Sequence, residues 1–569
     1  MPYTAAICAL NAKYIHSSLA PWCLAAGVRQ YAENVTAHVV EGSINEDEND
    51  VLTRILSFAP DAVTFTCYLW NIAETLRLAA AVKAAKPTAF VVLGGPEVSY
   101  CAAETLAQNP QIDCILSGEG ETSLPALLHA LAEGENLQTI DEKTQIDGLC
   151  TRAKITAPCV LHGAVPTPYT AEYLARLGGR IAYLETSRGC PYTCAFCLSG
   201  RCGKPRYFPL DTAFENILTL ANSGTQTVKF IDRTFNANPR HANAILAFIL
   251  AHIGKEIPRG VCFHFELAGD ILREETMKLF EKAPAGAFQL EIGMQSFCAK
   301  TLAAIRRKTD VAVLQKNILR LVAMQNMHVH IDLIAGLPYE DLQTFGESFN
   351  IGYALGANML QLGFLKLLHG AAMREEPQVY PCTFAQTPPY EVTQTPWLSA
   401  ADLAVLRAAE DALERVYNSG RFLETAAYLI DATQKTPFDF YCMLGEKGKS
   451  LGTHHVPLDD YTAFLYETGK QMSGVCVDAL RDAMVRDRLA TNATGRLPAC
   501  LQVKDPQLLA AVRALAQEAH TAPKKGIQRG VSLLYGAKKV CYADYSNAEK
   551  NPMTGRYPLH YAEMPSRKP

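Results

Sequence analysis

Three cysteines lie close together in segment 187–197, at Cys190, Cys194 and Cys197, with spacings of four and three residues. They directly follow a strand-like run, residues 181–186. Thiolates from so short a loop can surround one corner of an iron–sulfur cluster, and a cubane cluster takes four ligands. No fourth cysteine stands at a ferredoxin-like position, because Cys202 falls outside any such run. Three ligands leave one iron open, which is typical of a metal site that performs chemistry.

Two other interpretations of these cysteines remain open. A structural zinc site prefers four closed ligands in paired C-x-x-C units, and the loop holds one such unit. A chance arrangement of reduced thiols is the second alternative. A disulfide is disfavoured, because the eighteen cysteines of the chain are scattered mostly without paired spacing, as in cytosolic proteins. The pattern therefore favours an open cluster over zinc or chance.

The pattern C-x-x-x-C-x-x-C after a strand, with Phe196 before the last cysteine, resembles the radical S-adenosylmethionine (SAM) superfamily. The resemblance implies a 4Fe–4S cluster on Cys190, Cys194 and Cys197, with SAM bound to the open iron through its amino and carboxylate groups. It also implies that one electron cleaves SAM to methionine and a 5′-deoxyadenosyl radical. A low-potential electron donor such as flavodoxin or ferredoxin is then an expected partner.

The elements that must position this chemistry alternate between strand and helix from residue 180 to residue 369. Six strand-like runs predict an open, partial, TIM-like (βα)6 barrel; they are residues 181–186, 227–232, 261–266, 288–292, 328–334 and 360–365. The resemblance places segment 232–236 near the SAM amino group, segment 291–296 at its ribose and carboxylate, and segment 334–338 against adenine. The candidate SAM contacts are Phe196, Asp232, Glu266, Glu291, Gln295, Ser296, Gly336, Leu337 and Pro338.

Apolar strands also alternate with helices in the first 135 residues. Strands are expected at residues 4–10, 36–40, 62–67, 89–93 and 112–116, with helices at 20–31, 51–58 and 72–85. Continuous apolar strands separated by helices predict a doubly wound, Rossmann-like parallel sheet. Ligands of such sheets sit outside the carboxyl ends of the strands, where glycine lets backbone approach them closely.

The strand-end segments, lying ahead of the cluster motif, resemble the cobalamin-binding domain of class B radical SAM enzymes. The contacts implied for cobalamin are Asn11, Tyr14, His16, Ser17, Tyr68, Trp70, Gly94, Gly95, Pro96, Glu97, Gly118, Glu119 and Gly120. The D-x-H-x-x-G sequence that supplies histidine to cobalt in some cobalamin proteins is absent. Cobalt would thus be held without that ligand, and His16 is interpreted as a polar turn residue.

The length of 569 residues is too great for one core and predicts three domains. These are a cobalamin-binding domain at 1–135, the barrel at 179–385 and a mainly α-helical domain of unknown role at 386–569, with a linker at 136–178 between the first two. The net charge of −4 gives no overall attraction to nucleic acid or acidic membranes. No signal peptide and no run long enough to cross a bilayer is apparent. We therefore expect a cytoplasmic protein without membrane or nucleic-acid partners.

Together these features predict an enzyme that cleaves SAM reductively and transfers a methyl group to an unreactive carbon with the help of cobalamin. The alternatives are a radical SAM enzyme without functional cobalamin, which catalyses rearrangement, cyclisation or methylthiolation, and a non-catalytic iron–sulfur protein. Methylthiolation of tRNA is disfavoured by the net negative charge. The substrate class is a small molecule or a peptide; its identity cannot be read from the sequence.

Overall fold

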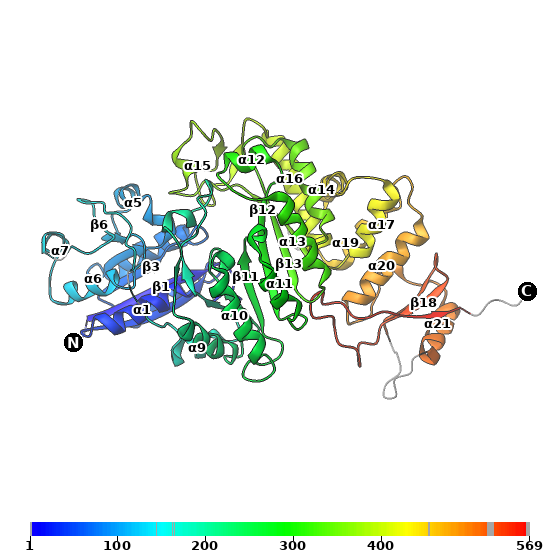
Figure 1. The fold of residues 1–569 in the computed structure, drawn as a ribbon, viewed down its shortest axis with the longest axis horizontal. Coiled ribbons are helices and arrows are strands. Elements are labelled where there is room, and N and C mark those ends of the chain that lie inside the picture. The colour runs from blue at the N-terminus through cyan, green and yellow to red at the C-terminus, as the bar shows by residue number, and fades with distance from the viewer. Residues whose placement is uncertain are drawn as a thin grey trace, which may run out of the picture. The chain divides into compact units, whose positions relative to one another are not determined.

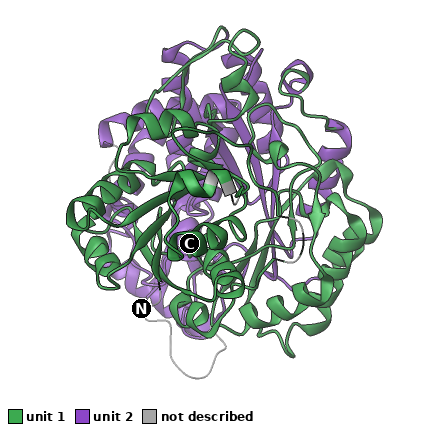
Figure 2. Cartoon of the chain, turned by 90° about the vertical axis from the view of Figure 1, so that its left-hand side faces the viewer, with its two compact units in different colours: residues 1–282, 303–309, 364–396 green, residues 283–302, 310–363, 397–569 purple. Residues whose placement is uncertain are grey.

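The computed structural model of the protein describes residues 3–143, 145–161, 163, 165–452, 456–519 and 529–564. The chain forms two compact units (Figure 2). The first comprises residues 1–282, 303–309 and 364–396, and the second comprises residues 283–302, 310–363 and 397–569. These units group the residues differently from the domains predicted above, because strands of the barrel occur in both.

The N-terminal part of the first unit is built on a six-stranded sheet with the order β2-β1-β3-β4-β5-β6. Its strands are β1 (Tyr3–Asn11), β2 (Val35–Ser43), β3 (Ala62–Thr66), β4 (Phe90–Gly94), β5 (Cys114–Leu116) and β6 (Leu149–Cys150). The first five are mutually parallel. Their interiors are buried and apolar, which is why they read as continuous hydrophobic runs. The order of a doubly wound sheet is therefore confirmed, with its switch point between β1 and β3.

Helices connect these strands (Figure 1). They are α1 (Ala20–Tyr31), α2 (Glu48–Leu56), α3 (Ile72–Ala85), α4 (Pro96–Ser99), α5 (Ala102–Gln108), α6 (Ser123–Ala132) and α7 (Leu137–Lys143). α1 packs with α6, and α2 packs with α3. The right-handed crossovers of parallel strands place these two pairs on opposite faces of the sheet. Both faces are thereby covered, as the sequence predicted.

The predicted linker contributes to this sheet, which the sequence analysis did not anticipate. Leu149–Cys150 pairs antiparallel with β5, and an isolated bridge joins Gly118 to Cys159. Without these residues β5 would present an unpaired edge to solvent. The same segment ends in α8 (Ala171–Leu177). Residues 136–178 are therefore partly a structural element of the first domain.

The segments that we expect to perform the radical chemistry form a second six-stranded sheet. In the first unit its order is β11-β10-β7, and in the second unit β14-β13-β12. The strands are β7 (Ala182–Leu184), β10 (Thr227–Phe230), β11 (Cys262–Leu267), β12 (Phe288–Gln295), β13 (His328–Ala335) and β14 (Met359–Phe364). Neighbouring pairs β7/β10, β10/β11 and β12/β13 are parallel. All six predicted barrel strands are thus present, in chain order.

Helices separate the strands of this second sheet. They include α9 (Leu210–Ala221), α10 (Pro239–His252), α11 (Glu274–Glu281), α13 (Val311–Ala323) and α14 (Leu342–Ala354). In β12 and β13 buried residues alternate strictly with half-buried ones. One face of each strand therefore packs on apolar side chains, while residues such as Glu291 and Gln295 point to the other face. This alternation leaves polar side chains on the face that lines a barrel.

The C-terminal part of the second unit is mainly helical, as predicted. Its helices are α16 (Ala400–Leu413), α17 (Leu423–Thr433), α18 (Pro437–Gly448), α19 (Leu458–Gly469), α20 (Val477–Thr491) and α21 (Pro506–Ala519). A three-stranded antiparallel sheet completes it, formed by β17 (Val531–Leu534), β18 (Lys539–Tyr542) and β19 (His560–Glu563). In the described part of the chain, no helix combines the length and apolar character needed to span a membrane.

Candidate cofactor sites

The three candidate cluster cysteines lie in one loop that a short strand pair closes. β8 (Ser187–Arg188) pairs antiparallel with β9 (Arg206–Tyr207), and the loop runs between them. Gly189 has a φ of +93°, and a Cβ atom there would lie 2.8 Å from the carbonyl oxygens of Gly203 and Lys204. Only glycine tolerates both this conformation and this contact. The sequence therefore closes the loop directly before Cys190.

Each of the three thiols has a hydrogen-bonding neighbour. These are Thr234 Oγ1 at 3.5 Å from Cys190 Sγ, Arg307 Nη1 at 3.8 Å from Cys194 Sγ, and the Ser199 backbone N–H at 3.4 Å from Cys197 Sγ. Burial raises the pKa of the Cys194 thiol, and the positive charge of Arg307 acts in the opposite direction. Hydrogen bonds to cluster sulfurs tune the reduction potential of an iron–sulfur site. The sequence analysis placed Thr234 in segment 232–236, near the SAM amino group, and it singled out neither Arg307 nor Ser199.

The donor set consists of three free thiols, which would bind a cluster as thiolates. Within the described residues, no group of three or more His, Cys, Asp or Glu side chains converges so as to hold one metal ion. The three cysteines of a cubane each ligate a different iron, so their sulfurs need to surround a volume and not one point. All eighteen cysteines are free thiols. Cys190, Cys194 and Cys197 are therefore available as ligands.

The middle of the loop is fixed by backbone hydrogen bonds. The Ala195 N–H donates to the Ile305 carbonyl at 2.9 Å, and the Met373 N–H donates to the Ala195 carbonyl at 2.9 Å. Phe196, the expected adenine neighbour, is half-buried. These bonds hold the segment between Cys194 and Cys197 from both sides, so the spacing of two of the three ligands does not depend on the loop ends.

Asp232 and Glu266 end two strands of the first unit and were expected near SAM. The Asp232 carboxylate is fully buried and accepts hydrogen bonds from the Thr186 N–H at 3.1 Å, the Thr186 hydroxyl at 2.8 Å and the Ser187 hydroxyl at 2.5 Å. Burial raises its pKa to about 6. Glu266 lies 3.7 Å from the ammonium of Lys229. Asp232 thus holds the residues that lead into the cluster loop, and its contact with SAM stays a prediction.

The remaining predicted SAM residues belong to the second unit, where β12 and β13 bring them together. Gln295 has a φ of +69° at a register shift between the two strands. The Ser296 hydroxyl donates to the buried Glu340 carboxylate at 2.6 Å, and the Thr301 hydroxyl donates to the Pro338 carbonyl at 2.9 Å. The end of β12 is therefore tied to the turn after β13.

Within that turn, Gly336 has a φ of +93°, which favours glycine. The Leu337 side chain is fully buried. Gly336 and Pro338 are buried as well. Glu291 stands on the half-buried face of β12. The contacts of these residues with SAM stay a prediction.

The predicted cobalamin residues gather at the carboxyl ends of β1, β3 and β4 and after β5. Asn71 donates to the carbonyls of Leu10 at 3.0 Å and Thr66 at 3.1 Å, which joins the ends of β1 and β3 at the switch point. The Trp70 indole N–H donates to the same Leu10 carbonyl at 3.2 Å. Trp70 stacks on Tyr68 with ring centroids 4.5 Å apart, and it remains 47% exposed. A flat aromatic surface therefore stands at the point where doubly wound sheets bind ligands.

Glycine backbone forms the rest of this edge. A Cβ at Gly95, where φ is +112°, would lie 2.5 Å from the Cys67 carbonyl oxygen, and a Cβ at Gly118 would overlap the Cys159 backbone. A Cβ at Gly94 would lie 3.3 Å from the Leu116 carbonyl oxygen. Side chains are excluded at these positions because neighbouring strand ends approach so closely. These glycines therefore let neighbouring backbone segments approach closely, and their contact with cobalamin stays a prediction.

Tyr14, His16 and Ser17 follow β1 and have different surroundings. His16 lies 2.7 Å from the Tyr183 hydroxyl through Nδ1, and its backbone bridges to Ile181. The Ser17 hydroxyl donates to the Ile181 carbonyl at 2.7 Å. Burial lowers the pKa of His16. His16 and Ser17 thus join the first sheet to β7, whereas Tyr14 is exposed.

The loops after β4 and β5 are also bonded to the barrel segments of the same unit. Glu97 is buried and accepts a 2.6 Å hydrogen bond from the Tyr390 hydroxyl. Arg188 and Arg206, from the closing strand pair of the cluster loop, form ion pairs with Glu119. The cobalamin edge and the cluster loop therefore belong to one compact unit. Arg188 carries no motif of its own, so no pattern of nearby residues indicates this role.

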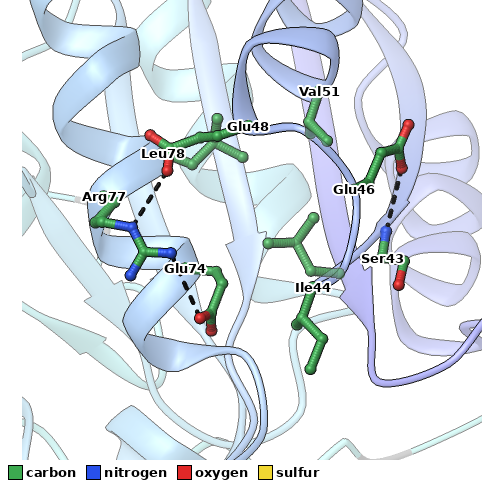
Figure 3. A pocket seen from close by; sticks show the side chains of 9 residues that line it. Ser43, Ile44, Glu46, Glu48, Val51, Glu74, Arg77 and Leu78 are labelled. Atoms are coloured by element: carbon green, nitrogen blue, oxygen red, sulfur yellow. Dashed lines mark hydrogen bonds and ion pairs between the residues drawn. The ribbon is translucent and has the colours of Figure 1, made fainter.

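A small hollow lies beside the ends of β1 and β2, against α2 and α3 (Figure 3). Its polar groups are paired with one another: Arg77 contacts Glu48 at 3.2 Å and Glu74 at 3.4 Å, and Glu46 accepts from the Ser43 N–H at 3.3 Å. No predicted cobalamin residue lines it. We therefore do not assign a ligand to this hollow.

Three protein-family models match consecutive parts of the chain. "B12 binding domain" matches residues 6–128, "Radical SAM superfamily" matches residues 184–350, and "Protein of unknown function (DUF4080)" matches residues 378–533. The chain combines a B12-binding domain with a radical SAM domain. The first supplies the cobalamin site, and the second supplies the sites for a 4Fe–4S cluster and SAM. The resemblance stated from the sequence is thereby confirmed.

The chain is also similar in sequence to curated proteins. The 2-(S-pantetheinyl)-carbapenam-3-carboxylate methyltransferase of Streptantibioticus cattleyicolor is 28% identical over 308 residues, which cover 50% of this chain and 44% of that protein. The chain thus spans about half the length of the curated relatives it matches.

Two solved structures share the fold. The radical SAM methyltransferase TsrM from Kitasatospora setae, with cobalamin and a 4Fe–4S cluster bound, aligns with a TM-score of 0.55 and 18% identity, covering 68% of this chain and 76% of TsrM. The cobalamin-dependent SAM radical enzyme OxsB, with aqua-cobalamin and SAM bound, aligns with a TM-score of 0.59 and 12% identity, covering 92% of this chain and 82% of OxsB. At these identities the likeness concerns the fold.

Proposed function

We propose that the protein is a cobalamin-dependent radical SAM methyltransferase that modifies an unreactive carbon of a small molecule or peptide. A low-potential protein such as flavodoxin or ferredoxin would supply the electron. The observation that carries this proposal is the joining, within one compact unit, of the three-cysteine loop to the glycine-lined edge of the B12-binding domain. An enzyme that uses both cofactors in one reaction needs them at a fixed separation.

Several residues have roles that follow from their contacts. Cys190, Cys194 and Cys197 would hold the cluster, and Arg307 would place positive charge beside it. Asp232 fixes the strand end that leads into the cluster loop. When bound, the cluster supplies one electron for the cleavage of SAM to methionine and a 5′-deoxyadenosyl radical, and cobalamin carries the methyl group.

Trp70 and the glycine backbone after β4 and β5 would support the corrin ring without a histidine ligand. His16 is held by a hydrogen bond between its Nδ1 atom and the Tyr183 hydroxyl, which joins it to β7. The stacked pair of Tyr68 and Trp70 instead offers an apolar surface. Removal of water from such a surface favours a planar ligand.

The cluster half of the proposal is tested by reductive cleavage of SAM. The protein would be purified without oxygen, reconstituted with iron and sulfide, and incubated with dithionite and SAM, and 5′-deoxyadenosine would be quantified by mass spectrometry. We expect Cys190→Ala, Cys194→Ala and Cys197→Ala each to lose the product by at least two orders of magnitude. Cys202→Ala is the matched control, because Cys202 is an exposed cysteine of the same loop. Retained cleavage in the three variants would refute the cluster assignment.

The cobalamin half is tested with SAM that carries a trideuterated methyl group. We expect the reconstituted protein to transfer the label to cobalamin, read as a mass increase of the bound cofactor, before any substrate is known. A protein that cleaves SAM but leaves cobalamin unlabelled would support one of the cobalamin-independent alternatives. A protein that does neither would support a non-catalytic iron–sulfur role.

A further inference from the structure

Arg188 is the last residue of β8 and stands two residues before Cys190. Its side chain contacts carboxylates from two parts of the chain. Its Nη2 atom lies 2.5 Å from Glu121, its Nε atom 2.9 Å from Glu185, and its Nη1 atom 3.5 Å from Glu119. Its side chain is only 13% exposed. A guanidinium presents its donors in a rigid planar fork, so one arginine can hold several carboxylates in fixed directions.

Two of these carboxylates belong to the B12-binding domain. Glu119 stands between Gly118 and Gly120, in the loop after β5 that we expect to contact cobalamin. Its second partner is Arg206, which pairs with Arg188 in the register of β8 and β9. Glu121 is buried, and its carbonyl oxygen lies so close to Gly27 that any Cβ there would overlap it. The loop therefore cannot move closer to α1, so a shift caused by a change at Arg188 would take it away from that helix.

Loss of the arginine would leave like charges close together. Glu119, Glu121 and Glu185 all lie within ion-pair distance of the one guanidinium. Carboxylates that share a partly buried site repel one another when the shared cation is removed, and unpaired buried charge is strongly unfavourable. The loop after β5 would relax by separating these groups. Its backbone would then depart from the position it has beside Gly118.

The cluster loop controls where Arg188 points. Gly189 follows directly, and its left-handed backbone is fixed by the carbonyls of Gly203 and Lys204. Cys190 comes next and would be anchored by iron. A cluster that orders Cys190 would therefore also restrict Arg188, which adds to the restraint from the strand pair and the three carboxylates.

We propose that Arg188 is a positioning residue that couples cobalamin binding in the loop after β5 to occupancy of the cluster loop. The inference rests on the proposed function only in requiring both cofactors to bind. Linkage makes the coupling reciprocal: a cluster that strengthens cobalamin binding is itself retained more strongly when cobalamin is bound. The protein would thus favour the state in which both cofactors are present.

The test is a comparison of cobalamin affinities. Hydroxocobalamin binding would be measured by equilibrium dialysis under anaerobic conditions, once with cluster-loaded protein and once with protein freed of iron by chelation. For the wild type we expect about tenfold tighter binding to the loaded form, within the usual range of coupling between sites. In Arg188→Lys the ratio of the two cobalamin affinities, loaded over iron-free, should fall to about one. One ammonium group cannot bond three carboxylates in the directions that a planar guanidinium reaches.

Two further variants make the comparison decisive. Glu121→Gln removes a partner of Arg188 that lies outside the cluster loop. It should therefore also lower the ratio of cobalamin affinities between the loaded and iron-free forms. This variant replaces Arg188→Lys should Arg188→Lys fail to retain iron. Arg54→Lys is the matched control and should keep the wild-type ratio, because Arg54 pairs with Glu46 at 2.7 Å in the same domain, away from the cluster loop.

Three outcomes would overturn the inference. A wild-type ratio of one, or an unchanged ratio in both Arg188→Lys and Glu121→Gln, would show independent cofactor sites and leave the proposed function standing. Failure of the wild type to bind cobalamin in either form would overturn the proposed function as well. A ratio that also falls in Arg54→Lys would indicate a general loss of stability of the domain.

Discussion

The Nη1 atom of Arg307 lies 3.8 Å from the Sγ atom of Cys194, a buried member of the cysteine trio. Arg307 also lies over the ring of Tyr192, with its guanidinium carbon 6.0 Å from the ring centroid. The arginine therefore comes from a different segment of the chain and meets the cluster loop at its middle. A positive charge at this distance favours whichever state of the cluster carries more electrons.

Arg307→Gln should lower the reduction potential of the cluster. A hydrogen bond to a charged group contributes about 2 kcal/mol, which corresponds to about 90 mV for one electron. The one-electron midpoint would be measured by a redox titration followed by electron paramagnetic resonance. We expect a shift to more negative potential of this order, with slower formation of 5′-deoxyadenosine at a fixed donor potential.

Arg306→Gln is the control for this shift. Arg306 is the preceding residue, but it is half-exposed and pairs with Glu376 at 2.5 Å instead of with a cysteine. Its substitution should leave the midpoint within error of the wild type. An equal shift in both variants would mean that net charge, and not the contact with Cys194, sets the potential.

Much of this arrangement could be predicted because it depends on local sequence. The cysteine spacing, the alternation of strands and helices, and the glycines at Gly94, Gly95 and Gly118 are properties of short segments. Their positions followed from the topology of parallel sheets. Arg188 and Arg307 could not be predicted in the same way, because each meets partners that are distant in the sequence. No pattern of residue types near Arg307 indicates that its side chain reaches Cys194.

Glu340 illustrates a second kind of omission. It follows the Gly336–Pro338 turn by two residues, yet the sequence analysis stopped at Pro338. In the structure Glu340 is fully buried and accepts hydrogen bonds from the hydroxyls of Ser296 at 2.6 Å and Ser348 at 3.0 Å through Oε1. Its Oε2 atom has no hydrogen-bond partner in the structure. From the sequence, a charged residue two positions beyond an apolar turn is expected to be exposed. Its burial depends on the packing of α14, which the sequence pattern does not show.

Glu340→Gln should change the pH dependence of stability. Burial raises the pKa of Glu340 to about 7 from 4.5. The folded state thus keeps a proton that the unfolded state releases between pH 4.5 and 7, so the wild type loses stability as the pH rises through this window, by about 3 kcal/mol at most. Glutamine carries no such proton. We expect the thermal midpoint of the variant, relative to wild type, to be higher at pH 8 than at pH 5.

Glu347→Gln provides the comparison, because Glu347 lies exposed on α14, the helix that follows Glu340. The difference in thermal midpoint between Glu347→Gln and the wild type should be the same at pH 5 and pH 8. Should Glu340→Gln also show equal differences at pH 5 and pH 8, the carboxylate would be ionised throughout, and its burial would not control its protonation.

Asp232 marks the limit of prediction by resemblance. Its place at the end of the second barrel strand suggested a contact with the SAM amino group. In the structure its carboxylate accepts hydrogen bonds from the hydroxyls of Thr186 and Ser187, and its contact with SAM stays a prediction. A buried carboxylate needs donors, and the nearest ones lie on the neighbouring strand. Position along a strand could be inferred from sequence, but the direction of its hydrogen bonds could not.

Trp70→Ala should weaken cobalamin binding without affecting the cluster. Trp70 stacks on Tyr68 at the switch point and leaves nearly half of its surface uncovered. An aromatic contact contributes about 0.5–1.5 kcal/mol beyond the area it buries, so we expect about a tenfold loss of affinity for hydroxocobalamin. The fold should persist, because the Leu10 carbonyl still accepts a hydrogen bond from Asn71. Iron content and the cluster spectrum should match the wild type.

Tyr31→Ala separates this effect from a general loss of exposed aromatic surface. Tyr31 is 46% exposed at the last residue of α1, a helix that begins beside the carboxyl edge of the sheet and runs away from it. It should bind hydroxocobalamin with wild-type affinity in the same equilibrium dialysis. Equal affinities in Trp70→Ala and Tyr31→Ala would place the corrin elsewhere, because a ligand seated at the β1–β3 switch point cannot avoid a half-exposed indole that stands there.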